Sequence, residues 1–148
     1  MHIEDTTAVW PRWNDRGIMD VFRTAMNEVL TSVDIGPERW GTGCSDMGDI
    51  CSLMPMVQGY VGGACGTEHG KDYCISHPET ACVDSAKVQL LVLKLLLEND
   101  AAKAKKIVAD YQPAFPDKEA YFAYMKSLKL NRQAVQYGEN GEITLSYK

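Results

Sequence analysis

Residues 15–33 carry a regular stripe of hydrophobic side chains. The stripe recurs every three or four residues, which is the spacing of one face of an α-helix. Asn14 or Asp15 can cap the first turn, because a short polar side chain accepts a hydrogen bond from a free backbone N–H. The pattern predicts an amphipathic helix with its apolar face in the core, formed by Ile18, Val21, Phe22, Ala25, Met26, Val29, Leu30 and Val33.

A second helical pattern covers residues 85–98 and is apolar on nearly every side between Leu90 and Leu97. Such a helix is expected to be buried against more than one layer. Asp84 is expected to cap it, and Asn99 with Asp100 is expected to end it before a lysine-rich helix that runs to Tyr111. Before this helix, the segment 76–79 (Ser-His-Pro-Glu) has the form of a capping box.

The remaining elements are short. The opening residues 2–4 read as the end of a strand, which suggests a chain that begins within a larger architecture. Strands are expected over residues 56–61 and 71–75, and helices over 46–54, ended by Pro55, and over 117–128, capped by Asp117. The alternation on either side of residues 138–141 predicts a C-terminal β-hairpin. The predicted fold is α/β, with helices on a small mixed sheet and a C-terminal helix and hairpin.

Charge and composition exclude several functions. The net charge is −5, and the lysines at 103, 105 and 106 are interspersed with acidic residues, so no basic face for nucleic acid or an anionic membrane is expected. The leucine-rich run is too short for a membrane span and contains Lys94. We therefore expect a soluble, cytoplasmic protein without nucleic-acid or membrane partners.

The chain has five cysteines and no Cys-x-x-Cys pair. An odd number at irregular spacing, without a signal peptide, favours reduced thiols over a disulfide framework. Structural zinc sites usually contain closely spaced ligand pairs, so a cysteine zinc cluster is not expected. The cysteines are interpreted as small buried hydrophobic residues.

Glycine is concentrated in front of one histidine. Seven of the twelve glycines lie between Gly41 and His69. A glycine-rich loop lets the backbone approach a ligand or metal closely, because no Cβ is in the way. A histidine at the end of such a loop can reach into a site. There is no Lys-Ser/Thr pair after these glycines and no Gly-x-Gly-x-x-Gly pattern, which argues against a phosphate-binding loop.

Three segments together resemble a known family. They are IEDTTAVWPRWNDRGIMDVF (3–22), GCSDMGDICSLMPMVQGYVGG (43–63) and TEHGKDYCISHPETACVDSAKVQLLVLKLLL (67–97). In this order they resemble the C-terminal half of zinc-dependent amidohydrolases and exopeptidases, a family that includes aminoacylases, acetylornithine deacetylase and carboxypeptidase G. The closest branch is the aminobenzoyl-glutamate hydrolase B-subunit type. The resemblance covers about residues 2–110.

The resemblance implies a three-layer αβα catalytic domain, of which residues 1–111 would be the C-terminal half and 112–148 a branch-specific extension. It implies that His69 binds one of two zinc ions, or another divalent metal, and that Gly43, Ser45 and Asp46 lie beside the substrate. In such enzymes two metal ions polarise an amide carbonyl and activate a water, and a glutamate accepts its proton.

The other metal ligands of the family come from a His-x-Asp pair, a bridging Asp and a Glu-Glu pair, and this sequence contains no counterpart of them. A catalytic zinc ion ordinarily needs three protein ligands. The chain is therefore expected to be inactive alone and to need a missing N-terminal half before it hydrolyses N-acyl amino acid or aminobenzoyl-glutamate-like amides. Alone, the chain is not expected to hold a metal cofactor tightly.

Two other interpretations stay open. The chain could be a non-catalytic interaction module that self-associates as a homo-oligomer, because half a domain leaves a sheet edge and an apolar face uncovered. It could also be an unrelated small α/β protein that shares only the glycine-rich loop. In that case the Ser45 loop and His69 would not lie together.

Overall fold

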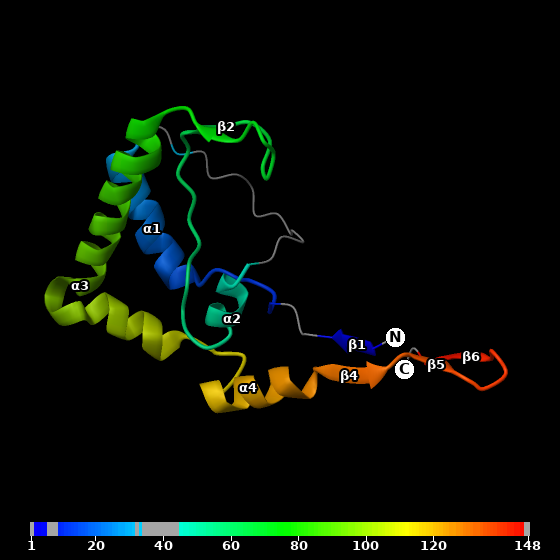
Figure 1. Ribbon diagram of the computed structural model, residues 1–148. Helices are drawn as coiled ribbons and strands as arrows, with labels where there is room; N and C mark the ends of the chain where they lie inside the picture. Colours follow the sequence, from blue (N-terminus) through cyan, green and yellow to red (C-terminus); the bar gives the residue numbers. More distant parts are fainter. Residues whose placement is uncertain (1, 6–8, 32, 34–44, 147–148) are drawn as a thin grey trace.

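The computed structural model describes residues 2–5, 9–31, 33 and 45–146, and consists of helices with three short two-stranded sheets (Figure 1). The helices are α1 (Arg16–Val29), α2 (Met47–Cys51), the π-helical turn η1 (Glu79–Asp84), α3 (Ser85–Asp110) and α4 (Lys118–Ser127). The strands are β1 (His2–Asp5), β2 (Ala64–Cys65), β3 (Cys74–Ile75), β4 (Leu130–Gln133), β5 (Val135–Tyr137) and β6 (Ile143–Leu145).

The expected mixture of helices and short strands is confirmed, but the strands are arranged differently from the prediction. They pair as β1–β4, β2–β3 and β5–β6, each antiparallel, instead of forming one mixed sheet. The β5–β6 pair confirms the C-terminal hairpin. The pair β1–β4 joins two segments that lie far apart in sequence, with His2 opposite Gln133.

The strand expected over residues 56–61 does not form. Its backbone groups bond to the start of α1 instead: the Met56 carbonyl accepts from the Asp15 N–H at 2.8 Å, and the Gln58 N–H donates to Asn14 Oδ1 at 3.1 Å. The segment therefore runs alongside α1 without a ladder partner. Of the strand expected over residues 71–75, only Cys74–Ile75 forms, as β3.

Helix α1 confirms the first prediction in its capping and its buried face. The Asp15 carboxylate accepts from the Ile18 N–H at 2.9 Å, and the helix ends four residues earlier than expected, where Leu30 is extended. Val21 and Ala25 are buried, and α1 packs along α3. A side chain at Gly17 would place its Cβ 2.8 Å from Ile107 Cγ1, so glycine permits the close approach of the two helices.

Helix α3 is broken where the sequence predicts. Asn99, Asp100 and Ala101 all have positive φ angles, of 53°, 57° and 55°, and they separate an arm that ends near Leu97 from a second arm that ends at Asp110. A run of left-handed residues reverses the helical path, because L-residues in this region cannot continue a right-handed helix.

Two predicted caps of the α3 region are wrong. The Asp84 side chain accepts no capping hydrogen bond, because the chain enters α3 directly from η1 and the Ser85 N–H already donates to carbonyls of that turn. The Ser76 hydroxyl does not cap a helix either, since it donates to the Gly63 carbonyl at 3.3 Å. The Asp84 carboxylate instead accepts from Lys87 Nζ at 3.1 Å, and the Ser76 hydroxyl bonds to a backbone carbonyl.

The burial predicted for the leucine-rich arm of α3 on nearly every side is wrong for one face, whereas Leu91, Leu95 and Leu96 are half-buried. Leu90, Leu93 and Leu97 are 67%, 53% and 58% exposed, and we call these three residues the leucine face. In Figure 1, α3 lies at the outer edge of the molecule, with α1 beside its first arm. Within the described ranges, no helix has both the length and the apolar character that a membrane span requires.

Helix α2 lies between the N-terminal segment and the segment that follows α3. The Trp10 N–H donates to Asp49 Oδ1 at 2.8 Å, the Trp13 N–H donates to Cys51 Sγ at 3.4 Å, and the Tyr111 hydroxyl donates to the Cys51 carbonyl. Nearby, the Trp10 ring packs edge-on against Phe115 with ring centroids 5.2 Å apart. These contacts form a second packed region, separate from the α1–α3 face.

Candidate functional site

His69 lies in the turn between β2 and β3. The Gly70 N–H donates to the Thr67 carbonyl at 2.7 Å, which closes a four-residue turn with His69 at its third position. The Asp72 carboxylate supports the turn by accepting from the Thr67 N–H at 3.2 Å. The strands on either side hold this turn at the end of a hairpin, so the imidazole is presented at its tip.

The backbone of His69 is left-handed, with φ of 61°, and its side chain is exposed. For a residue with a Cβ this conformation costs about 1 kcal/mol or more, whereas glycine adopts it freely. Gly66 and Gly70 are close by in the same loop. Strained non-glycine residues are concentrated at functional sites, which makes this histidine a candidate ligand.

Ser45 belongs to a polar cluster at the start of α2. Its hydroxyl donates to Gln58 Oε1 at 3.2 Å, and Gln58 Nε2 donates to the Tyr60 hydroxyl at 2.9 Å. Gln58 was not singled out from the sequence. No sequence signal could have identified it, because it meets Ser45 only through the folding of the segment 56–61 against the N-terminal segment.

Arg12 supplies the positive charge of this cluster. Its Nη1 donates to Gln58 Oε1 and, at 3.2 Å, to the Tyr60 hydroxyl. Both partners are neutral, so the described contacts leave the guanidinium charge without a carboxylate. The position of Arg12 between two tryptophans was the only available sequence signal. An arginine held in this way can bind an external carboxylate through its paired N–H groups.

The other predicted site residues have different surroundings. Asp46 lies exposed immediately before α2 without a side-chain capping bond, while the carboxylate of Asp49, in the first turn of α2, accepts from the Trp10 N–H. Gly43 lies outside the described residues. The interpretation of the cysteines as buried is confirmed for Cys51 and is wrong for Cys65, Cys74 and Cys82, which are exposed.

Cys51 is not an activated nucleophile. Burial raises the pKa of its thiol above the ordinary value, although the N–H of Trp13 partly opposes this effect. A thiol with a raised pKa stays protonated at neutral pH, and the reactive form of cysteine is the thiolate. Cys51 therefore has a structural role in the packing around α2.

A pocket of about 290 Å³ adjoins the Ser45 cluster. Gln58 belongs to both, and the walls come from α1, from the segment 57–61 and from the start of α3, with Phe22, Val88 and Gln89 among the lining residues. A Cβ on Gly59 would fall 2.0 Å from Phe22 Cζ, so a larger residue would require this ring to move. The pocket combines apolar walls with amide groups, as small-molecule sites commonly do.

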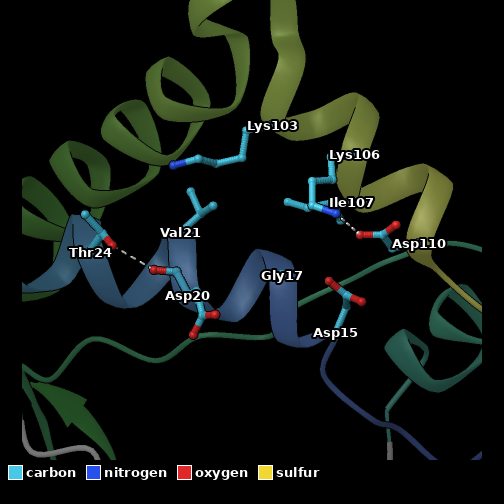
Figure 2. Close-up of a pocket in the computed structure, with 9 residues that line it drawn as sticks. All are labelled: Asp15, Gly17, Asp20, Val21, Thr24, Lys103, Lys106, Ile107 and Asp110. Atoms are coloured by element: carbon cyan, nitrogen blue, oxygen red, sulfur yellow. Dashed lines mark hydrogen bonds and ion pairs between the residues drawn. The ribbon is translucent and has the colours of Figure 1, made fainter.

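A second pocket, of about 330 Å³, lies between α1 and the second arm of α3 (Figure 2). Its charged side chains include Lys106, which bonds to Asp110 at 2.6 Å, and Asp15, which caps α1. The charges of these groups already take part in interactions within the two helices that form the pocket. None of the predicted site residues lines it.

The described residues do not by themselves fit a catalytic zinc ion. No three histidine, cysteine, aspartate or glutamate side chains come together as a possible metal site within the described part of the chain. Among the described residues, His69 is exposed, lines neither of these two pockets and has no hydrogen bond to Ser45. The shared site implied by the resemblance is therefore not observed, and the arrangement is the one expected of an unrelated small α/β protein. A zinc ion at His69 would therefore need its further ligands from outside the described residues.

No family model, curated protein or solved structure matches this chain.

Proposed function

We propose that this chain is one part of a metal-dependent amidohydrolase and is inactive without the polypeptide that supplies the remaining metal ligands and the general base. The observation that carries the proposal is His69, an exposed histidine in left-handed backbone at the tip of a supported hairpin. In the complete protein its imidazole is one ligand of a zinc ion or another divalent metal. The helices and short strands then belong to one larger three-layer αβα domain.

The Ser45 cluster gives this chain a substrate-binding role. N-acyl amino acids and aminobenzoyl-glutamate-like amides carry a carboxylate, and the Arg12 guanidinium offers a positive charge whose described partners are both neutral. Ser45 and Gln58 offer neutral polar groups beside it, next to the pocket at Phe22. Arg12 holds the substrate carboxylate, and Ser45 and Asp46 lie at the edge of the same site.

The large surface of the chain supports the need for a second polypeptide. The accessible surface is 11209 Å², whereas a compact monomer of this mass would expose about 7500 Å². Part of the difference lies on the leucine face, which is more than half exposed in all three residues. An apolar patch of this kind is typical of a protein–protein contact.

The test is hydrolysis of aminobenzoyl-glutamate and of N-acyl amino acids by this chain, with and without the N-terminal half of an aminobenzoyl-glutamate hydrolase. That half carries the His-x-Asp and Glu-Glu pairs. We expect no activity from the chain alone, and activity with bound zinc from the mixture. His69→Ala should remove both the activity and the bound zinc of the mixture. Arg12→Gln should raise the KM of the mixture about tenfold or more, with a smaller effect on kcat.

His77→Ala is the matched control, because His77 is also exposed but bonds to its neighbour Ser76. It should leave activity and zinc content unchanged. Hydrolysis by the chain alone, or full activity of the His69→Ala mixture, would contradict the proposal.

A second candidate function, favoured by the exposed leucine face, is a non-catalytic module that associates with copies of itself. Here the leucine face of one chain would cover that of another. Light scattering over a rising concentration series distinguishes the two proposals. A mass that rises from monomer to dimer supports the module, and a constant monomer mass counts against it.

A further inference from the structure

Cys65 and Cys74 face each other across the hairpin that carries His69. They are direct partners in the antiparallel pair β2–β3, and their Sγ atoms are 3.5 Å apart. Both residues are exposed and both thiols are free. Each sulfur is therefore accessible to a reagent from solvent and to the other sulfur.

This arrangement is close to that of a disulfide. Directly opposed residues on antiparallel strands have Cα atoms about 4.5–5.5 Å apart, which lies within the range that a disulfide spans. The sulfurs need to approach only from 3.5 Å to about 2.05 Å. We propose that Cys65 and Cys74 form a reversible disulfide that closes the His69 loop under oxidising conditions.

The oxidant is a peroxide, and the reaction balances with hydrogen peroxide. The thiolate of one cysteine attacks a peroxide oxygen, the O–O bond breaks, and the products are a sulfenic acid and a hydroxide ion, which takes a proton to become the first water. The second thiolate then attacks the sulfenic sulfur, so that the S–S bond forms and the S–O bond breaks. The hydroxyl leaves as a second water after taking a proton. The two thiols lose two electrons in total, and a dithiol reductant returns them by exchange.

The other described cysteines are poor alternatives. Cys51 is buried around α2, and Cys82 is exposed on η1 but makes no sulfur–sulfur contact with another described cysteine. The reduced pair also agrees with the sequence, because an odd number of cysteines does not indicate a permanent framework. Reversible disulfides in reducing compartments usually serve as redox sensors or catalysts.

Closing this bond would restrict the loop that presents His69. Residues 66–73 would become a ring tied at both ends, while Gly66 and His69 keep their positive φ angles of 94° and 61°. A cross-link lowers the conformational freedom of the open loop, so the oxidised hairpin should hold the imidazole in fewer orientations. This consequence does not depend on the identity of the ligand that His69 binds.

Mass spectrometry tests the proposal directly, because Lys71 lies between the two cysteines. The folded chain is treated with hydrogen peroxide, its remaining thiols are alkylated in denaturant, and it is digested with trypsin. Cleavage after Lys71 separates the two cysteines into different peptides. We expect these two peptides to stay joined through Cys65 and Cys74, with a mass two hydrogen atoms below the sum of the separate peptides. Only three of the five cysteines should then be alkylated. Dithiothreitol should separate them.

Matched serine variants give the controls. Cys65→Ser and Cys74→Ser should each abolish the link, whereas Cys82→Ser, also at an exposed cysteine, should leave it unchanged. Circular dichroism confirms that each variant is folded. Five alkylated cysteines after peroxide treatment, or a link that survives in Cys65→Ser or Cys74→Ser, would overturn the proposal.

Discussion

At the scale of single residues, Gly48 determines how closely α2 approaches the N-terminal segment. A Cβ at this position would lie 1.6 Å from the Trp10 carbonyl oxygen, a backbone atom that cannot rotate away. The Trp10 N–H is also held by Asp49, one residue further along the same helix. The position therefore accepts only glycine.

Gly48→Ala is expected to destabilise the protein by about 3 kcal/mol, because the backbone of two segments has to move apart. Gly62→Ala is the matched control, since a Cβ at Gly62 has no atom within 4 Å. Its effect should stay below about 0.5 kcal/mol. The measurement is urea unfolding followed by tryptophan fluorescence. Equal midpoints for the two variants would show that α2 does not pack in this way.

Tyr111 should make stability depend on pH in the alkaline range. Burial raises the pKa of its phenol above the ordinary value of 10.0. A group with a raised folded-state pKa contributes stability that is present below its unfolded pKa and is lost as pH rises through the folded pKa. The stability contributed by this phenol is therefore expected to fall as pH increases above about 10.

The comparison with Tyr111→Phe isolates this effect. Near pH 7 the variant should be less stable by about 1 kcal/mol, because the Cys51 carbonyl loses its donor. The difference between the two proteins should shrink above about pH 10, as the wild-type phenol ionises. The pKa of Tyr121 is also raised, but Tyr121 is present in both proteins, so its contribution to the pH dependence cancels in the comparison. A difference that stays constant or grows with pH would be inconsistent with a buried, hydrogen-bonded phenol.

Caps show what could be predicted for single residues. Asp15 and Asp117 cap α1 and α4 as expected, because each bonds to an N–H three residues ahead. Ser76 and Asp84 have equally good local patterns but do not cap. Gly63, distant in sequence, accepts from Ser76, and η1 already occupies the N–H groups near Asp84. A local pattern predicts a cap only where no distant backbone partner competes.

At the scale of elements, the kink in α3 stores strain at Ala101. Alanine with φ of 55° is disfavoured by its Cβ, whereas glycine has no such penalty. Ala101→Gly is expected to stabilise the protein by about 1 kcal/mol, measured by thermal unfolding. Ala104→Gly, three residues further in regular helix, should destabilise it by about 1 kcal/mol. Destabilisation by both substitutions would contradict the kink, because it would mean that Ala101 lies in regular helix and that α3 is continuous.

Helices were more predictable than strands in this chain. The spacing of apolar residues fixes α1, and the kink of α3 follows from Asn99 and Asp100, because both signals are local. The segment 56–61 has the composition of a strand, but its Met56 carbonyl and Gln58 N–H bond to Asp15 and Asn14, immediately before α1. Pairing between distant segments decides whether an extended segment joins a sheet, and the sequence pattern does not contain that information.

At the scale of the whole molecule, the candidate site is assembled from segments that are far apart in sequence. The cluster of Ser45, Gln58 and Arg12 exists because the segment 56–61 lies against the N-terminal segment. Family resemblance could suggest Ser45 and His69 as separate positions. It could not suggest Arg12 or the pocket beside Gln58, because both depend on this packing.

The leucine face is a surface where the sequence pattern predicts burial and the structure shows exposure. A helix that is apolar on nearly all sides is normally buried, yet Leu90, Leu93 and Leu97 are exposed here. The prediction of burial and the observed exposure agree if another polypeptide covers this surface. If the proposed function is correct, the N-terminal half of an amidohydrolase would cover this surface, in the same assembly that would supply the remaining metal ligands to His69.

Sedimentation equilibrium of this chain mixed with the N-terminal half of an aminobenzoyl-glutamate hydrolase tests this account most directly. We predict a one-to-one complex that Leu93→Lys weakens by about thirtyfold, because a charge would replace a buried leucine. Lys94→Ala, at the exposed neighbouring position, should bind like the wild type. Two separate species in the wild-type mixture, or equal binding by Leu93→Lys, would contradict it.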